Sequence, residues 1–228
     1  HTKDYCRHCK CHYHSSRSFL FCYHCYKRSS HQTCKCGNYN TGDGITMATA
    51  IGADTVDMQY IQTYPTCDAE TGALLYVADV RLDSYGVLVN KEGKRFVEEL
   101  EARNVISKAV TEQTGACSYL FWDEDAMQKS GVAETHKAEY EDLLARGQLV
   151  KADTLEACCE HFGVDAENLK QTVADWNQYC ADGEDKEFNK RGDLIPIAEE
   201  GPYYMLVSKP AIHHTMGGIV IDTDAHVL

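Results

Sequence analysis

The hydrophobic pattern divides the chain near residue 40. Residues 1–40 contain no Val or Ile and a single leucine, Leu20. Such a segment cannot bury enough apolar surface to fold unaided, and it needs a metal ion, disulfides or a host surface. From Thr41 onwards, short apolar runs alternate with amphipathic stretches. This pattern predicts an α/β or α+β fold for the rest of the chain.

Short apolar runs bounded by turn residues predict the strands. The clearest runs are residues 85–90 and 118–122. The turn at residues 91–94 places Gly93 where a left-handed backbone is favoured. Further strands are expected at residues 55–62, 203–207 and 218–221.

Helical spacing and capping residues predict the helices. Thr154 and Asp165 are expected to be N-caps, because their side-chain oxygens can accept from backbone N–H groups of the first turn. Glycines at 52 and 163 end two of the helices. The predicted helices cover residues 45–51, 103–111, 155–162 and 166–179. The apolar face of the last one, which we assign to the core, consists of Leu169, Val173, Trp176 and Tyr179.

Charge is distributed as unevenly as hydrophobicity. Residues 1–36 have seven Lys or Arg and one acidic residue, a net charge of +6. The remainder has 15 basic and 34 acidic residues, a net charge of −19. An acidic body of this kind repels phosphate backbones, so nucleic acid is not expected as a partner. No apolar run approaches the roughly 18 residues needed to span a bilayer, and the N-terminus has no signal-peptide pattern.

The cysteines concentrate in the first segment, which holds seven of the twelve. Two CxxC pairs suit a tetrahedral zinc site, because each pair binds from one tight turn. The alternative is a segment that remains disordered. A c-type haem is disfavoured, since no His directly follows either pair. The candidate zinc ligands are Cys6, Cys9, Cys22 and Cys25.

Three polar stretches fit neither a core nor an ordinary surface. They are residues 61–66 (IQTYPT), residues 77–103 with VADVR and GKRFVE, and residues 211–218 (AIHHTMGG). Each has a structural explanation when taken alone, for example a strand end, a surface ion pair or a polar turn. Their combination is what indicates chemistry.

In their order and spacing, these stretches resemble the flavoproteins of the fumarate reductase and succinate dehydrogenase family. The resemblance covers residues 41–228 and rests on TGDG, IQ-x-x-PT, LVN-x-EGKRFV-x-E, a following Arg and HHTMGG. It implies part of a Rossmann-type FAD-binding domain over residues 41–85 and 202–228. It also implies a mobile capping domain over residues 86–201.

The family's residue roles transfer to matching positions. The resemblance implies that Asp43 and His214 contact FAD and that His213 binds the substrate carboxylate. It also implies that Arg103 donates a proton, and we add Arg81 as a candidate relay residue. The implied reaction reduces the C=C bond of an α,β-unsaturated carboxylate, with hydride from flavin N5 and a proton from Arg103.

Two departures from the fumarate-reducing pattern point to a different substrate. Tyr64 stands where those enzymes have His, and Asp79 lies in the element that normally reads Thr-Glu-x-x-Arg. Asp79 would oppose a second carboxylate, whereas it can accept from an imidazole N–H and stabilise the protonated ring. This pair resembles the urocanate-reducing members of the family, whose product is imidazole propionate.

Other parts that the family needs for activity are not found in residues 41–228. No G-x-G-x-x-G follows a predicted strand, so the pyrophosphate-binding fingerprint is missing. The resemblance implies an electron-donor protein or domain, an FMN bound covalently on another domain, and a periplasmic or otherwise extracytoplasmic location. Two alternatives remain: a reductase of fumarate or another 2-enoate, and a non-catalytic fragment with a zinc-binding leader.

Overall fold

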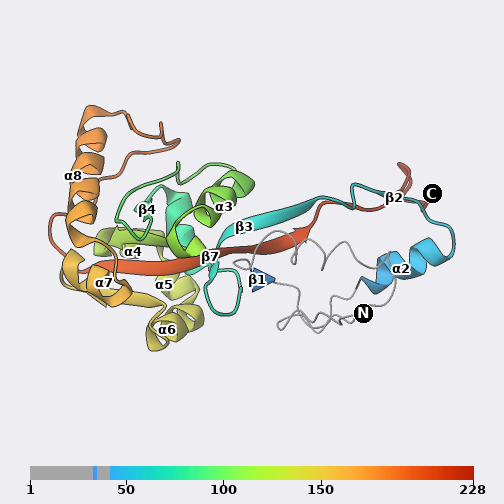
Figure 1. Ribbon diagram of the computed structural model, residues 1–228, viewed down its shortest axis with the longest axis horizontal. Coiled ribbons are helices and arrows are strands. Elements are labelled where there is room, and N and C mark those ends of the chain that lie inside the picture. Colours follow the sequence, from blue (N-terminus) through green and yellow to red (C-terminus); the bar gives the residue numbers. More distant parts are fainter. Residues whose placement is uncertain (1–32, 35–41) are drawn as a thin grey trace.

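The computed structural model describes the backbone of Thr33–Cys34 and residues 42–228. These residues form mixed helix and sheet structure, as predicted. Figure 1 shows a helix-covered part at one end and a thin extension at the other. We call residues 61–213 the body and residues 42–60 and 214–228 the arm.

Strand β7 (Tyr203–Thr215) organises the sheet. Its first half pairs antiparallel with β5 (Ser118–Asp123) and β6 (Leu149–Ala152). Its second half pairs antiparallel with β3 (Ile61–Asp68) and parallel with β1 (Thr33–Cys34). Strand β4 (Val87–Val89) continues the sheet beyond β5. Strand β7 therefore pairs both with β3, from the predicted FAD-binding part, and with β5 and β6, from the predicted capping part. The division into domains stays a prediction.

The body has a core on each face of the sheet, because successive strand residues point to opposite faces. Leu120 and Trp122 of β5 join one cluster, whereas Tyr119 and Phe121 join the other. The first face is covered by the 3-10 segment η1 (Val77–Asp83) and by helices α3 (Arg103–Thr111), α4 (Glu124–Ser130), α5 (Val132–Thr135) and α6 (Lys137–Ala145). The second face is covered by α7 (Leu155–Phe162) and α8 (Ala166–Asp182). A short 3-10 turn, η2 (Thr114–Ala116), leads into β5.

The locally encoded features agree with the prediction. The side chains of Thr154 and Asp165 accept from backbone N–H groups at the starts of α7 and α8. Helix α8 extends three residues beyond the predicted end at Tyr179. Gly93 has φ of 72°, and a Cβ there would lie 2.4 Å from the carbonyl oxygen of Asp165. Glycine therefore lets this turn pack closely against the start of α8.

The arm differs from the body in having no buried residue. It contains α2 (Asp43–Ala50) and a two-stranded ladder of β2 (Thr55–Val56) with β8 (Gly218–Ile219). The continuous strand predicted over residues 55–62 is wrong, because Asp57 has φ of 56° and interrupts it. Gly217 lies against this interruption, where a Cβ would be 2.3 Å from the carbonyl oxygen of Val56.

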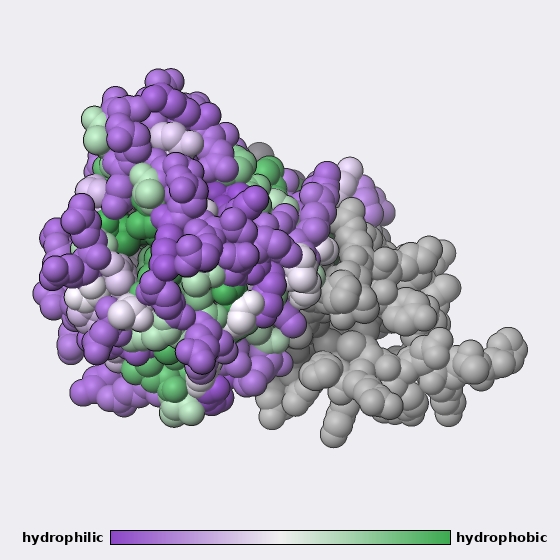
Figure 2. All heavy atoms as spheres, turned by 60° about the vertical axis from the view of Figure 1, so that its left-hand side comes forward, coloured by the Kyte–Doolittle hydropathy of each residue, from purple (hydrophilic) through white to green (hydrophobic). Residues whose placement is uncertain are grey.

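The exterior of the body is polar over most of the face that Figure 2 shows, with apolar residues gathered in hollows between hydrophilic ones. None of the helices in residues 42–228 has the length and apolar character required to cross a membrane.

Candidate active site

Tyr64 and Asp79 form a hydrogen-bonded pair inside the body. Tyr64 is on β3 and 7% exposed, and its hydroxyl donates to Asp79 Oδ1 on η1 at 3.3 Å. Burial raises the pKa of Tyr64, and the charge of Asp79 raises it further. Burial also raises the pKa of Asp79, although the hydrogen bond from Tyr64 and the charge of Arg81 oppose this shift. The pair thus presents a carboxylate whose ionisation is costly and which gains from a cationic partner.

Arg103 and His213 converge on the same tyrosine. The guanidinium carbon of Arg103 lies 5.1 Å from the centre of the Tyr64 ring. The His213 ring meets the Tyr64 ring edge-on, with 5.3 Å between centroids. Arg103 begins α3, which lies beside the β3–β7 ladder (Figure 1) and places this side chain over the strands. The four residues predicted as proton donor and substrate ligands therefore share one location.

Gln62 connects Arg103 and His213 and was not predicted as a site residue. Its Oε1 accepts from Arg103 Nη1 at 2.9 Å and lies 3.3 Å from His213 Nδ1. A hydrogen bond to this oxygen requires the proton on Nδ1, so only a protonated His213 also donates from Nε2. The sequence signal for Gln62 was its place in the IQ-x-x-PT motif, two residues before Tyr64.

Arg81 follows Asp79 by two residues on η1 and is 3% exposed. Its Nη1 donates to the backbone oxygen of Glu99, and its Nε has no hydrogen-bond partner among the described residues. Burial lowers the pKa of Arg81, while the charges of Tyr64 and Asp79 oppose this. No hydrogen bond joins Arg81 to Arg103 within residues 42–228. Arg81 is therefore electrostatically close to the Tyr64–Asp79 pair, and its role as a relay residue stays a prediction.

The two residues expected to contact FAD lie in the arm. Asp43 is the first residue of α2, and His214 follows His213 on β7 with 4.9 Å between the two rings. Both side chains are exposed, and no hydrogen bond joins them in the described part of the chain. Their chemistry fits FAD in part. Asp43 can accept from a hydroxyl, and a Cβ at Gly42 or Gly44 would meet no atom of the described residues within 4 Å, so these residues leave room for a ligand beside the backbone. These residues can form one portion of a flavin site.

Burial disfavours the thiolate form of three cysteines in the described region. Burial raises the pKa of Cys158 and of Cys159 to about 12, and that of Cys180 to about 11. Half-buried Asp222 and exposed Asp224 and His226 form a group in the arm whose ligand atoms lie within 4.8 Å of one another. The four predicted zinc ligands, Cys6, Cys9, Cys22 and Cys25, lie outside the described residues.

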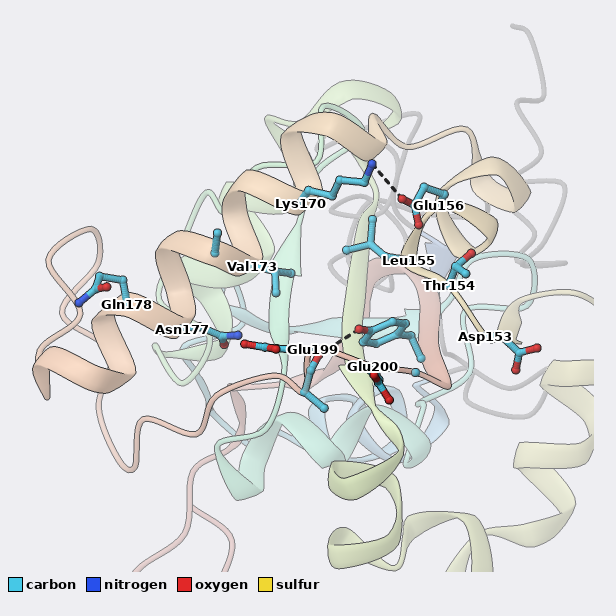
Figure 3. A pocket seen from close by; sticks show the side chains of 14 residues that line it. Asp153, Thr154, Leu155, Glu156, Lys170, Val173, Asn177, Gln178, Glu199 and Glu200 are labelled. Atoms are coloured by element: carbon cyan, nitrogen blue, oxygen red, sulfur yellow. Dashed lines mark hydrogen bonds and ion pairs between the residues drawn. The ribbon is translucent and has the colours of Figure 1, made fainter.

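A separate hollow of about 750 Å³ lies between α7, α8 and the start of β7 (Figure 3). Asn177, which lines it, exchanges hydrogen bonds with the backbone of Ile197, and Lys170 forms an ion pair with Glu156 at 2.8 Å. None of the predicted site residues lines this hollow. It is an acidic surface depression and not part of the Tyr64 group.

Comparison with known proteins identifies related sequences and folds. The family described as FAD binding domain matches residues 22–228. The urocanate reductase of Eggerthella lenta is 53% identical over 188 residues, which are 82% of this chain and 31% of that protein. A fumarate reductase (cytochrome) of Shewanella frigidimarina is 37% identical over 187 residues, again 82% of this chain and 31% of the relative. The chain thus spans about a third of the length of these curated relatives.

A solved structure has the same fold. The open conformation of a flavocytochrome c3 fumarate reductase superimposes with a TM-score of 0.72 and 32% identity, over 92% of this chain and 36% of that one. A 3-ketosteroid delta1-dehydrogenase from Sterolibacterium denitrificans superimposes with a TM-score of 0.62 and 27% identity, over 84% of this chain and 39% of that one.

Proposed function

The chain belongs to the family of FAD-binding domains, and we propose that it provides the substrate site of a flavin-dependent reductase acting on the C=C bond of an α,β-unsaturated carboxylate. We further propose urocanate as the substrate and imidazole propionate as the product. The hydrogen-bonded pair of Tyr64 and Asp79 beside Arg103 and His213 carries this proposal.

Electrostatics at the Tyr64–Asp79 end favour an imidazole over a second carboxylate. Two like charges about 4 Å apart repel by about 4 kcal/mol at an effective dielectric constant near 20. A protonated imidazole reverses the sign of this interaction, and its N–H can donate to Asp79. Because burial already raises the pKa of Asp79, a cationic ring also offsets part of the cost of keeping that carboxylate ionised.

The other end of the site has donors for the substrate carboxylate. A protonated His213 donates from Nε2 while Nδ1 remains on Gln62, and this arrangement stabilises negative charge that develops on the carboxylate. Arg103, held by Gln62 and the Tyr64 ring, is the proposed proton donor to the substrate α-carbon. Its exposed position allows reprotonation from solvent. Bound flavin supplies the hydride, and Asp43 and His214 are the residues of this chain proposed to hold it.

Substitution of Asp79 tests the substrate assignment. We expect Asp79→Ala to lower kcat/KM for urocanate by about tenfold or more, because the buried hydrogen bond to the ring is lost. The matched control is Asp83→Ala, which removes an exposed carboxylate from the same 3-10 segment and should change kcat/KM by less than about twofold. Unchanged urocanate turnover in Asp79→Ala would refute the assignment.

Fumarate or another 2-enoate is the second candidate substrate, supported by the 37% identical fumarate reductase. Kinetics with urocanate and fumarate on the wild-type flavoprotein separate the two, since an ionised Asp79 disfavours the dicarboxylate. A preference for fumarate would overturn the proposal.

Further proposals concern the protein around this site. We propose that residues 86–201 cap the substrate and that a separate protein or domain donates electrons. We also propose that another domain carries a covalently bound FMN and that the protein acts in the periplasm or another extracytoplasmic location. We also retain zinc at Cys6, Cys9, Cys22 and Cys25 as a proposal. Metal analysis of the purified protein, with the four cysteines replaced by serine as control, tests it.

A further inference from the structure

The 3-10 segment η1 carries both Asp79 and Arg81, yet it is only seven residues long. Hydrogen bonds in 3-10 helices have poorer geometry than in α-helices, so a short segment of this type is weakly held by its own backbone. Its position must therefore depend on contacts from elsewhere in the body. Two of these contacts are made by charged side chains, one at each end.

Glu139 holds the start of η1. Its Oε1 accepts from the backbone N–H of Val77 at 2.7 Å, across 62 positions in the sequence. Glu139 lies in the first turn of α6, four positions before Leu143, which belongs to the same apolar cluster as Val77 and Val80. Burial raises the pKa of Glu139, because it disfavours the charged carboxylate. The hydrogen bond from the Val77 N–H stabilises that carboxylate and lowers the pKa in turn.

Lys190 holds the other end. Its Nζ donates to the backbone oxygens of Ser84 at 3.1 Å and Gly86 at 3.2 Å. The lysine side chain is 0% exposed, and its Nζ lies 3.9 Å from Glu99 Oε2 and 4.6 Å from the centre of the Trp176 ring. Ser84 ends η1 with φ of 70°, a conformation that is unfavourable for a residue with a side chain. The bond from Lys190 helps to stabilise it.

The signs of the two charges suit the segment between them. An anion at the start of a helical segment and a cation at its end both interact favourably with the aligned peptide dipoles. Neither Glu139 nor Lys190 contacts Tyr64, Arg103 or His213 through any hydrogen bond found in residues 42–228. What the two residues have in common is that both bind the backbone at the ends of η1.

We propose that Glu139 and Lys190 are positioning residues that set the affinity for the imidazole end of the substrate by fixing η1, and with it Asp79, opposite Tyr64. This inference rests on the proposed urocanate reduction. The Tyr64–Asp79 hydrogen bond of 3.3 Å is already longer than the usual maximum of about 3.0 Å for a hydroxyl donor, so a small displacement of η1 breaks it. His213 and Arg103 are carried by β7 and α3. The hydrogen bonds and ion pair found for the side chains of Glu139 and Lys190 in residues 42–228 involve neither of these elements.

A double-mutant cycle with the intact flavoprotein tests this proposal. We expect Glu139→Ala and Lys190→Met each to lower kcat/KM for urocanate by about tenfold, mainly through KM, because Asp79 is displaced. In an Asp79→Ala background, the same substitutions should cost less than about twofold, since the group that they position is gone. Glu139→Gln keeps an oxygen acceptor for Val77 N–H and should retain most of the wild-type value.

Leu169→Ala is the matched control for lost stability. Leu169 is 0% exposed on α8, in the core on the opposite face of the sheet. Any effect of Leu169→Ala on kcat/KM should be the same with and without Asp79. Losses from Glu139→Ala and Lys190→Met that persist in the Asp79→Ala background would overturn the proposal, as would a Glu139→Gln variant as impaired as Glu139→Ala. If Lys190→Met does not fold, the comparison of Glu139→Ala with Glu139→Gln, each with and without Asp79, tests the proposal by itself.

The wild-type measurement separates the two levels of inference. A wild-type enzyme that does not reduce urocanate refutes the proposed function and this inference together. A wild-type enzyme that reduces urocanate, with additive effects in the cycle, refutes only the positioning role.

Discussion

The body and the arm are encoded by one continuous sequence but differ in how they are stabilised. The body has three apolar clusters, the smallest of which contains Tyr64, and a buried ionic group. No residue of the arm is buried, and Met47 and Ile51 are 65% and 88% exposed. The site residues divide along the same line. Those proposed to contact substrate lie in the body, and those proposed to contact FAD lie in the arm. Substrate geometry is thus supported by packing, and the flavin contacts have no such support within the described residues.

The largest effect should come from breaking the ionic group of the body. Arg95 is 1% exposed at its side chain and bonds Glu99 and Asp185 at 2.8 to 3.0 Å. We expect Arg95→Leu to lower the free energy of unfolding by about 3–5 kcal/mol, because two buried carboxylates lose their partner.

Chemical denaturation monitored by tryptophan fluorescence measures this loss. The control is Lys108→Ala, which removes an exposed pair with Glu112 at 3.9 Å and should cost less than about 0.5 kcal/mol. Equal losses in the free energy of unfolding of the two variants would show that the buried ionic group stabilises the body no more than an exposed ion pair does.

The second prediction compares apolar residues of the two regions directly. Leu169→Ala in the body should cost about 3 kcal/mol, since it leaves a cavity in a packed core. Ile51→Ala in the arm should cost less than about 0.5 kcal/mol in the same denaturation experiment, because the isoleucine is already solvent-exposed. A loss above 2 kcal/mol for Ile51→Ala would mean that the arm is covered in solution and would remove the contrast.

Local features of the body were predictable because their causes are local. Thr154 and Asp165 were identified as caps from residue type alone, and α3 begins at Arg103 and ends at Thr111 as predicted. The interruption at Asp57 was missed, since no Gly or Pro marks that left-handed residue. The length of β7 was also missed, because HHT becomes a strand only through its pairing with β3.

The site was predictable only through its motifs. Periodicity contains no information on contacts between Tyr64 and His213, which are 149 positions apart, and the motif order supplied the expectation that they meet. Gln62 was not predicted as a site residue, because its role depends on the direction of its side chain relative to α3 and β7. Glu139 and Lys190 escaped for the same reason, since both act on the backbone of η1.

The third prediction concerns acid stability of the body. Burial opposes ionisation of Asp185, but hydrogen bonds from Arg95 outweigh it and hold the pKa of Asp185 at about 2. A depressed carboxyl pKa contributes stability that is present above the ordinary value near 4 and is lost as pH falls towards 2. The loss should be roughly 2 kcal/mol. Urea denaturation at pH 5 and pH 2 measures it, and Asp185→Asn should show a smaller pH dependence.

The smallest effect is expected at Asp79, with the opposite sign. Because burial raises the pKa of Asp79, the folded protein binds its proton more tightly than the unfolded chain does. Stability attributable to Asp79 is therefore complete below pH 4 and decreases as pH rises through its folded-state pKa. Asp79→Asn cannot ionise, so relative to wild type it should be more stable at pH 7 than at pH 3, by less than the Asp185 effect. Urea denaturation at the two pH values measures the difference. If Asp79→Asn lost stability at pH 7 instead, Asp79 would be a structural carboxylate like Asp185, and the assignment of this acid to substrate recognition would lose its physical basis.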